Sequence, residues 1–297
     1  MLASCLPPAT MTVVGAKCRD FIKPLSGCEQ PLIACSRLAV FYVPKEWYIG
    51  KMKKRLVIAN WKMYIQSPEA AKGFVAGLKR KTKNINNVEV WIAPPFTVLP
   101  LLKGVKVGAQ TVAAHAEGAY TGDVSATMVK HAGASFAIIG HSERRAFGLT
   151  NEQVHAQLAA AAGAGLVPVL CVGERERTQD GSHFSVIEEQ LTSALRGAQS
   201  LSSKLVVAYE PVWAIGKSAS EAMQQEELQE TVIFIRKILA DILGRAGARK
   251  VRILYGGSVE GANAHPLITE GGVGGFLVGH ASAELDSFVE ILKACQK

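Results

Sequence analysis

Residues able to transfer a proton lie directly after short apolar runs. Glu210 follows Val206–Tyr209, where a buried carboxylate needs a partner or a function. Lys62 and His141 follow two other runs. A carboxylate can act as a general base, a neutral imidazole can donate a hydrogen bond to a carbonyl oxygen, and an ammonium group stabilises negative charge. Together these groups predict proton abstraction beside a carbonyl group in an anionic substrate.

Small residues suited to phosphate binding follow later runs. Gly216, Ser258 and Gly279 lie where backbone N–H groups are expected to be exposed, and such groups at helix ends commonly bind phosphate. Taken singly, each candidate has a simpler explanation: a solvated lysine, a structural histidine or a turn glycine. Their common position after strands favours a site for a small phosphorylated substrate.

The apolar runs predict strands. They are short, rich in Val and Ile and nearly continuous in apolarity, which is typical of parallel strands covered on both faces. The runs are Arg55–Ala59, Glu89–Ala93, Val105–Ala109, Phe136–Gly140, Val167–Val172, Leu205–Tyr209, Val251–Tyr255 and Gly275–Val278.

Helical patterns occupy the intervals between these runs. Ser67 supplies an N-cap, Thr150 and Gln153 form a capping box, and an apolar stripe steps by four and three residues from Leu228 to Ile242. Connections between parallel strands must cross over, and helices are the usual solution.

Eight strands alternating with helices over about 245 residues predict an α/β protein, a single (β/α)8 barrel spanning residues 53–297. A doubly wound sheet is the competing architecture, but it would show a Gly-rich loop after the first strand, where Asn60–Lys62 lies instead. A barrel opens the carboxyl ends of its strands onto one face, which would bring the candidate residues together.

Residues 1–52 have scattered prolines and cysteines and no hydrophobic periodicity. We interpret them as an N-terminal extension, irregular or a leader, with an organelle-targeting segment as the alternative because acidic residues are sparse. A secretory signal is disfavoured, since Pro7 and Pro8 interrupt the segment and no basic region precedes it.

The composition excludes other classes of protein. With 48% hydrophobic and 20% charged residues among 297, the chain is neither mostly disordered nor collagen-like. No apolar run approaches the roughly 18 residues of a membrane helix. Six cysteines do not indicate a disulfide scaffold at this length. The formal net charge of +8 suggests an anionic partner without separating nucleic acid from small phosphates.

Several motifs resemble those of the triosephosphate isomerase family, in the family's order and from about Lys53 to the C-terminus. They are Asn60–Met63, Gly118–Asp123, Ile139–Arg145, Val169–Glu174, Tyr209–Gly216 and Tyr255–Val259. The resemblance implies a barrel enzyme that interconverts glyceraldehyde 3-phosphate and dihydroxyacetone phosphate through an enediolate. This isomerase step belongs to glycolysis and gluconeogenesis and links them to pentose phosphate metabolism.

The resemblance also implies catalytic roles. Glu210 would transfer the proton, His141 would be the electrophile, and Lys62 would stabilise substrate and enediolate charge. Glu143 would orient Lys62. The residues implied to bind substrate are Asn60, Lys62, Gly216, Ser258, Gly279 and His280.

The resemblance further implies a lid and a partner. The segment from Pro211 to about Ala219 would close over the phosphate and exclude water. The expected partner is a second copy of the chain, in a homodimer whose Thr121 loop lies near the partner's Lys62. No metal, organic cofactor, nucleic acid or membrane is implied, and the expected location is the cytoplasm.

Three positions depart from the family pattern. Lys217 follows Gly216 at once, where two residues usually intervene, so the second hinge of the lid is expected to be shortened or shifted. His280 replaces the second residue of a Gly-Gly pair, which keeps the N–H group but narrows the allowed backbone conformations. Tyr64 replaces an asparagine near the expected dimer interface.

Two alternatives remain open from the residues alone. In a Schiff-base aldolase Lys62 would be the nucleophile, but a lysine nucleophile needs desolvation, and Glu143 would keep it charged. In a non-catalytic protein that binds RNA or another anion, basic clusters such as Lys79–Lys83 would make the contact, but no stacking aromatics are interleaved with them.

Overall fold

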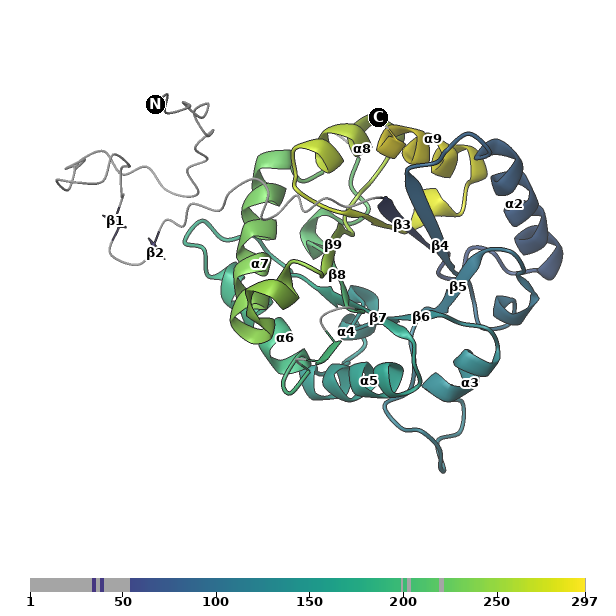
Figure 1. Cartoon of the computed structure of the whole chain (residues 1–297), viewed down its shortest axis with the longest axis horizontal. Helices are drawn as coiled ribbons and strands as arrows, with labels where there is room; N and C mark the ends of the chain where they lie inside the picture. Colours follow the sequence, from purple (N-terminus) through teal and green to yellow (C-terminus); the bar gives the residue numbers. More distant parts are fainter. Residues whose placement is uncertain are drawn as a thin grey trace, which may run out of the picture.

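A computed structural model describes residues 34–35, 38–39, 54–198, 200–201, 204–218 and 222–296 (Figure 1). Within the predicted extension, strands β1 (Ala34–Cys35) and β2 (Leu38–Ala39) pair antiparallel. The rest of that extension, and its boundary at residues 52 and 53, lie outside the described residues.

The body of the chain is a closed parallel barrel in the strand order β10-β3-β4-β5-β6-β7-β8-β9 (Figure 1). The predicted fold class is therefore confirmed, and every predicted run matches a strand to within one residue at each end. The strands are β3 Arg55–Asn60, β4 Val88–Ala93, β5 Lys106–Ala109, β6 Phe136–Ile139, β7 Val167–Val172, β8 Val206–Tyr209, β9 Arg252–Tyr255 and β10 Gly275–Val278.

Helices surround the barrel and cover its outer face, as Figure 1 shows. The α-helices are α2 Pro68–Lys81, α3 Ala126–His131, α4 Ser142–Ala146, α5 Asn151–Gly163, α6 His183–Ala194, α7 Gln225–Ala248, α8 Gly261–Thr269 and α9 Leu285–Gln296. Short 3-10 turns are η1 Leu99–Leu101, η3 Val212–Ala214 and η4 His280–Ser282. Between β4 and β5 the crossover is made by η1, since few residues separate these strands.

The predicted helix starts are confirmed by their hydrogen bonds. Ser67 Oγ accepts from the Ala70 N–H at 3.1 Å. Thr150 Oγ1 accepts from the Gln153 N–H, and the Gln153 side chain accepts from the Thr150 N–H, which is the predicted capping box. Helix α7 is interrupted at Gly244, whose φ of 71° lies in the left-handed region.

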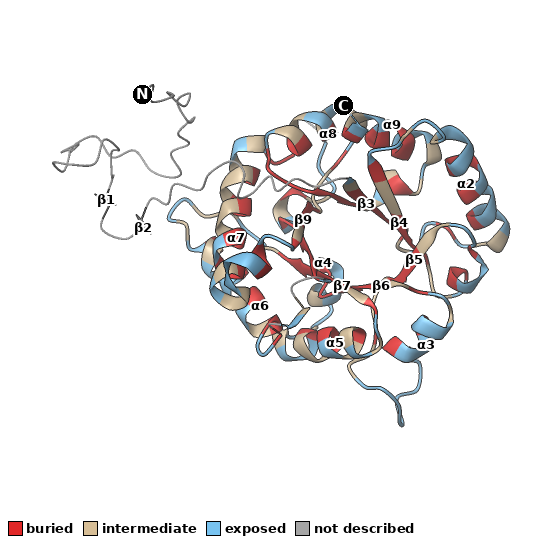
Figure 2. Cartoon of the chain, viewed as in Figure 1, coloured by how far each residue is buried: buried red, intermediate tan, exposed pale blue. Residues whose placement is uncertain are grey.

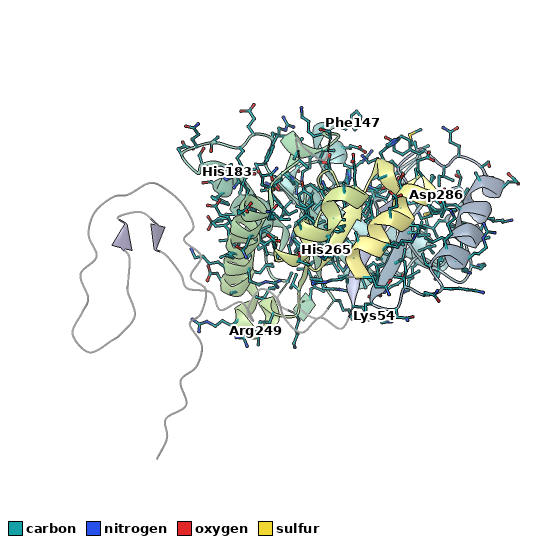
Figure 3. All side chains as sticks on the ribbon, turned by 90° about the horizontal axis from the view of Figure 1, so that it is seen from above. Lys54, Phe147, His183, Arg249, His265 and Asp286 are labelled. Carbon is teal, nitrogen blue, oxygen red and sulfur yellow. The ribbon has the colours of Figure 1, made fainter. Side chains whose placement is uncertain are left out.

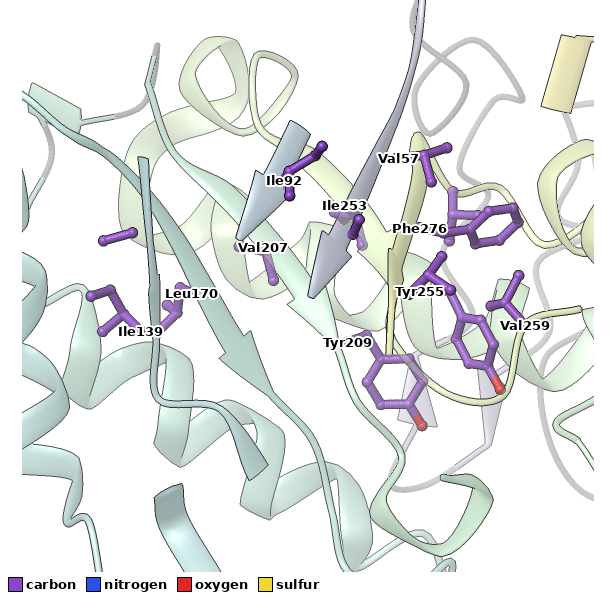
Figure 4. Packing of buried hydrophobic residues seen from close by; sticks show 14 of the residues in the cluster. Val57, Ile92, Ile139, Leu170, Val207, Tyr209, Ile253, Tyr255, Val259 and Phe276 are labelled. Carbon is purple, nitrogen blue, oxygen red and sulfur yellow. The ribbon is translucent and has the colours of Figure 1, made fainter. Parts of the chain in front are cut away.

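The core has two layers, because successive side chains of a strand point to opposite faces. One layer fills the barrel and includes Ile58, Trp91 and Phe136. The other lies between the barrel and the helices and includes Val57, Tyr209 and Phe276 (Figure 4). Figure 2 shows the same arrangement as buried strands surrounded by helices with exposed outer faces.

A charged cluster lies at the amino ends of the strands. Trp91 Nε1 donates to Glu89 Oε1 at 2.7 Å, and Lys106 Nζ lies 3.7 Å from the Trp91 ring centroid. Arg252 Nη1 donates to Glu89 Oε2 at 2.8 Å. Burial works to raise the pKa of Glu89, but the hydrogen bonds from Arg252 and Trp91 outweigh it and lower that pKa. The cluster closes this end of the barrel with satisfied polar groups.

None of the helices in the described part of the chain combines the length and the apolar character that crossing a bilayer requires.

Ile138 tests the packing of the barrel interior. We expect Ile138→Ala to lower the free energy of unfolding by about 2–5 kcal/mol, because the side chain is 1% exposed and its removal leaves a cavity. Urea denaturation at fixed protein concentration measures the change. Val186→Ala, at a position 41% exposed on α6, is the control and should change stability by less than about 0.5 kcal/mol. An equal decrease in the free energy of unfolding in the two variants would contradict the placement of Ile138 in the barrel interior.

Candidate active site

The alternation of the strands carries two polar side chains to the mouth of the barrel. Ile58 and Ala208 belong to the barrel interior, and two residues further on the inward positions are Asn60 and Glu210. At the same level four other strands are followed by glycines: Gly140, Gly173, Gly256 and Gly279. Small residues at these positions leave the space in which a small substrate can meet both polar side chains.

Glu210 is buried, with 2% of its surface exposed, and its carboxylate has two partners. Oε2 accepts from the Ser142 N–H at 2.9 Å, and Oε1 lies 3.3 Å from His141 Nε2. Neighbouring glycines make room for it: a Cβ on Gly173 would lie 1.9 Å from the Glu210 carbonyl oxygen, and one on Gly256 would lie 2.9 Å from Glu210 Cγ. The sequence therefore supplies both the carboxylate and the space around it.

The protonation of His141 follows from its place at the N-cap of α4. The Glu143 N–H donates to His141 Nδ1 at 3.2 Å, so Nδ1 is an acceptor and the ring proton lies on Nε2. Nε2 faces the mouth, 3.3 Å from Glu210 Oε1, to which it can donate. With the proton on Nε2, its 3.3 Å approach to Asn60 Nδ2 is a contact between two donors and not a hydrogen bond. A neutral imidazole thus presents an N–H donor beside a carboxylate.

Lys62 is held in a left-handed backbone conformation, with φ 45°, which side chains with a Cβ rarely adopt. Its N–H donates to Asn60 Oδ1 at 3.2 Å, and its carbonyl accepts from Gln110 Nε2 at 2.8 Å. The ammonium donates to Glu143 Oε1 at 2.6 Å. These contacts fix both the backbone and the charge of Lys62. The sequence analysis missed Gln110, which no motif on the sequence distinguishes.

The predicted phosphate-binding residues lie on two sides of the mouth. Gly279 is next to Lys62, because a Cβ on Gly279 would lie 3.4 Å from Lys62 Nζ. Gly216 is exposed with φ 74°, and the Ser258 N–H donates to the Ala214 carbonyl at 3.2 Å. In this structure the Ser258 amide is therefore bonded to the predicted lid segment.

His280 occupies an ordinary backbone conformation, since Lys62 is the one residue other than glycine with positive φ in the described ranges. Its imidazole lies edge-to-face against the Tyr64 ring, with 4.9 Å between centroids and 70° between planes. Two of the three positions that depart from the family pattern are thus in contact with each other.

Glu174, to which the sequence analysis gave no role, anchors the start of the predicted lid. This carboxylate is 1% exposed, and its Oε1 accepts from Tyr209 Oη and from Trp213 Nε1, each at 2.9 Å. Burial, and next the Glu174 charge, raise the pKa of Tyr209 well above its ordinary value, so the phenol remains a donor. The signal available in the sequence was an acidic residue directly after an apolar strand. Ala219, the predicted end of the lid, lies outside the described residues.

A cleft of about 620 Å³ lies on the outer side of Glu210. It is lined by the turn after β6, including Ser142 and Arg145, and by the loop after β7, including Glu174. Glu210 lines this cleft, whereas Lys62, His141 and Gly279 do not, so the cleft adjoins the mouth on one side of Glu210. In the described part of the chain no group of three His, Cys, Asp or Glu residues is placed to hold a metal ion.

Comparison with known proteins gives one consistent result. Residues 55–295 match a family model described as "Triosephosphate isomerase". The triosephosphate isomerases of Citrifermentans bemidjiense and Endomicrobium trichonymphae are each 41% identical to the chain over 251 residues, covering 82% of this chain and 99% of theirs. The crystal structure of triosephosphate isomerase from Bartonella henselae superposes with a TM-score of 0.71 at 34% identity, over 82% of this chain and all of that one.

The reactivity of two buried thiols, Cys171 and Cys295, tests the burial described for the core. Burial, and next the Glu210 charge, raise the pKa of Cys171 well above its ordinary value, and burial raises the pKa of Cys295 to about 12. Because the thiolate is the reactive form, we expect iodoacetamide at about pH 8 to leave both unlabelled in the native protein and to label both in guanidinium chloride. Peptide mass spectrometry measures the labelling.

An exposed thiol introduced by Ser185→Cys on α6 serves as the control and should react in the native protein. Labelling of native Cys171 at the rate of this control thiol would contradict the burial described.

Proposed function

The chain belongs to the triosephosphate isomerase family, and we propose that it interconverts D-glyceraldehyde 3-phosphate and dihydroxyacetone phosphate with Glu210, His141, Lys62 and Glu143 as its catalytic residues. The observation that carries the assignment of residues is the meeting of Glu210 and neutral His141 at the mouth of the barrel, 3.3 Å apart. The reaction is the isomerase step of glycolysis and gluconeogenesis.

Glu210 and His141 have complementary tasks. The carboxylate removes a proton from the carbon next to the carbonyl and returns it to the neighbouring carbon, so no net proton is consumed. The Nε2–H of His141 donates to the oxygen on which negative charge develops, and donates equally well to either oxygen of the enediolate. Because His141 Nδ1 is already occupied by the Glu143 N–H, the ring keeps its proton on the side that faces substrate.

Lys62 supplies positive potential. Its ammonium donates to Glu143 Oε1 at 2.6 Å, and this ion pair orients it. A Schiff-base aldolase would need this amine in its neutral form. The ion pair opposes that alternative, and the family membership supports neither it nor a role confined to binding RNA or another anion.

Substrate is bound by Asn60, by Lys62 and by backbone N–H groups around the phosphate. The proposed donors are the amides of Gly216, Ser258, Gly279 and His280. The Ser258 amide must exchange its bond with the Ala214 carbonyl for one with phosphate, so phosphate binding and movement of the lid are coupled. A closed lid excludes water from the enediolate.

The catalytic unit is the barrel of residues 53–297, and residues 1–52 form an extension to it. All proposed site residues lie between Asn60 and His280, which supports this division. A function in central sugar metabolism supports a cytoplasmic location.

Homodimerisation is proposed from exposed apolar side chains on neighbouring loops. Met63 is 80% exposed, Phe147 84% and Tyr120 44%, on the loops that follow β3, β6 and β5. The loop between β5 and α3, which carries Thr121, projects beyond the ring of helices in Figure 1. Within it the His115 and Tyr120 rings stack at 3.9 Å, which stiffens the loop. Such a patch is suited to burial against a second copy of the chain.

Glu210→Gln tests the proposed base. The amide keeps the size of the side chain and can still accept from the Ser142 N–H, but it cannot take up a proton. We expect kcat to fall by about 10²–10⁴-fold in a coupled assay that follows conversion of glyceraldehyde 3-phosphate to dihydroxyacetone phosphate. Glu188→Gln, on the exposed face of α6, is the matched control and should leave kcat unchanged. If Glu210→Gln retains full activity, another residue is the base.

Phe147→Asp tests the proposed dimer. A charge at this exposed position, near the carboxyl ends of the strands (Figure 3), would be buried in the interface. Light scattering should give twice the mass of one chain for the natural protein and the mass of one chain for the variant. Val186→Asp, which places a charge at an exposed apolar position on α6, should remain dimeric. A natural protein with the mass of a single chain would refute the dimer.

A further inference from the structure

Two segments that bind substrate in the proposed function meet where the barrel closes. Strands β10 and β3 pair in register from Gly275 with Leu56 to Val278 with Ala59. Beyond the strands, the two segments that continue from β3 and β10 remain side by side. One carries Asn60, Lys62 and Tyr64, and the other carries Gly279, His280 and Ser282. The distance between the Lys62 ammonium and the phosphate-binding amides is therefore set by contacts across this seam.

Three contacts join the two segments. Ser282 Oγ reaches the Asn60 carbonyl at 3.4 Å. The end of the Lys62 side chain packs on Gly279, where a Cβ would lie 3.3 Å from Cε and 3.4 Å from Nζ. Furthest from the strands, the rings of Tyr64 and His280 meet edge-to-face. The ring contact thus closes the outer end of the seam.

The backbone around Tyr64 is held by two glutamines, since Gln110 Nε2 donates to the Lys62 carbonyl at 2.8 Å and Gln66 Nε2 donates to the Met63 carbonyl at 3.4 Å. The Tyr64 N–H closes a turn onto the Trp61 carbonyl at 3.0 Å, but Met63 and Tyr64 are 80% and 52% exposed. Within this turn Lys62 has the unfavourable φ of 45°. A strained residue keeps its conformation only when its surroundings hold it, and the ring contact holds the far side of the turn.

We propose that Tyr64 and His280 are positioning residues, a ring pair that fixes the Lys62 ammonium relative to the phosphate-binding turn at Gly279. The proposal rests on the proposed isomerase function and assigns a task to two side chains where the family usually has an asparagine and a glycine. The His280 backbone N–H binds phosphate, and its imidazole acts through Tyr64 on Lys62. Because Glu143 already orients the Lys62 ammonium, the pair sets the distance of that ammonium from Gly279, and it therefore affects phosphate binding more than the chemical step.

A double-mutant cycle tests this task in the full-length protein. The variants are Tyr64→Ala, His280→Ala and the double variant, and the readouts are kcat, KM for glyceraldehyde 3-phosphate and the inhibition constant of inorganic phosphate. An aromatic edge-to-face pair contributes about 2- to 10-fold to an equilibrium constant. Each single variant should raise KM and the phosphate inhibition constant by that factor, with kcat within about twofold. The double variant should match the single ones, because the second change removes a contact already lost.

Conservative and control variants distinguish a positioning role of the ring pair from a general effect on folding or assembly. Tyr64→Phe keeps the ring and should restore the natural KM, whereas Tyr64→Leu, which keeps bulk without an aromatic ring, should behave as Tyr64→Ala and replaces it if that variant does not fold. Val186→Ala alters an exposed residue on α6, outside both the seam and the proposed dimer patch, and its KM should not change. Light scattering on each variant shows whether a change in KM follows a change in assembly.

The outcomes distinguish this inference from the proposed function. Additive effects in the double variant, an unchanged KM in His280→Ala, or a KM change that only accompanies dissociation would overturn the ring pair while the natural protein still turns over. Absence of isomerase turnover in the natural protein would instead refute the proposed function.

Discussion

The site depends on the burial of one carboxylate at the centre of a barrel mouth. Glu210 is almost fully removed from solvent, and such a charge is stable only where donors face it. The Ser142 amide and the neutral imidazole of His141 supply those donors, and both come from the single turn that follows β6. Gly173 and Gly256 are required on either side because any larger residue would collide with Glu210. The glycines, the helix start at Ser142 and the tautomer of His141 are all consequences of holding that charge in place.

The barrel makes this arrangement reproducible. Parallel pairing fixes the level at which each strand ends, and alternation of side chains decides which of two consecutive residues faces the axis. Asn60 and Glu210 face the axis because Ile58 and Ala208 do. A slip of one residue in β8 would bury Tyr209 in the barrel and turn Glu210 toward the helices. The register, and not any single hydrogen bond, therefore determines that the carboxylate of Glu210 lies at the mouth.

Much of this could be predicted from the sequence, and the remainder shares a physical reason for being missed. Apolar runs located the strands to within about a residue, and capping residues such as Thr150 located helix starts, because both signals are local. The convergence of Lys62, His141 and Glu210 followed from the rule that strand ends share one face. Gln110, the bonds to Glu174 and the contact of Tyr64 with His280 were not predicted. They join side chains from segments distant in sequence, and no spacing along the chain records such contacts. The interruption of α7 at Gly244 was not predicted either, because it lies just beyond the apolar stripe that ends at Ile242.

The two ends of the barrel have different roles in the structure. At the amino end, Glu89, Trp91, Lys106 and Arg252 satisfy one another and close the interior without help from the loops above. Lys54 and Arg249 lie toward that end in Figure 3, away from Phe147. The loops at the carboxyl ends of the strands can consequently be redesigned without altering the amino end. A library of variants that randomises the residues lining the mouth could be screened for new substrates, while the polar cluster at the amino ends of the strands stays unchanged.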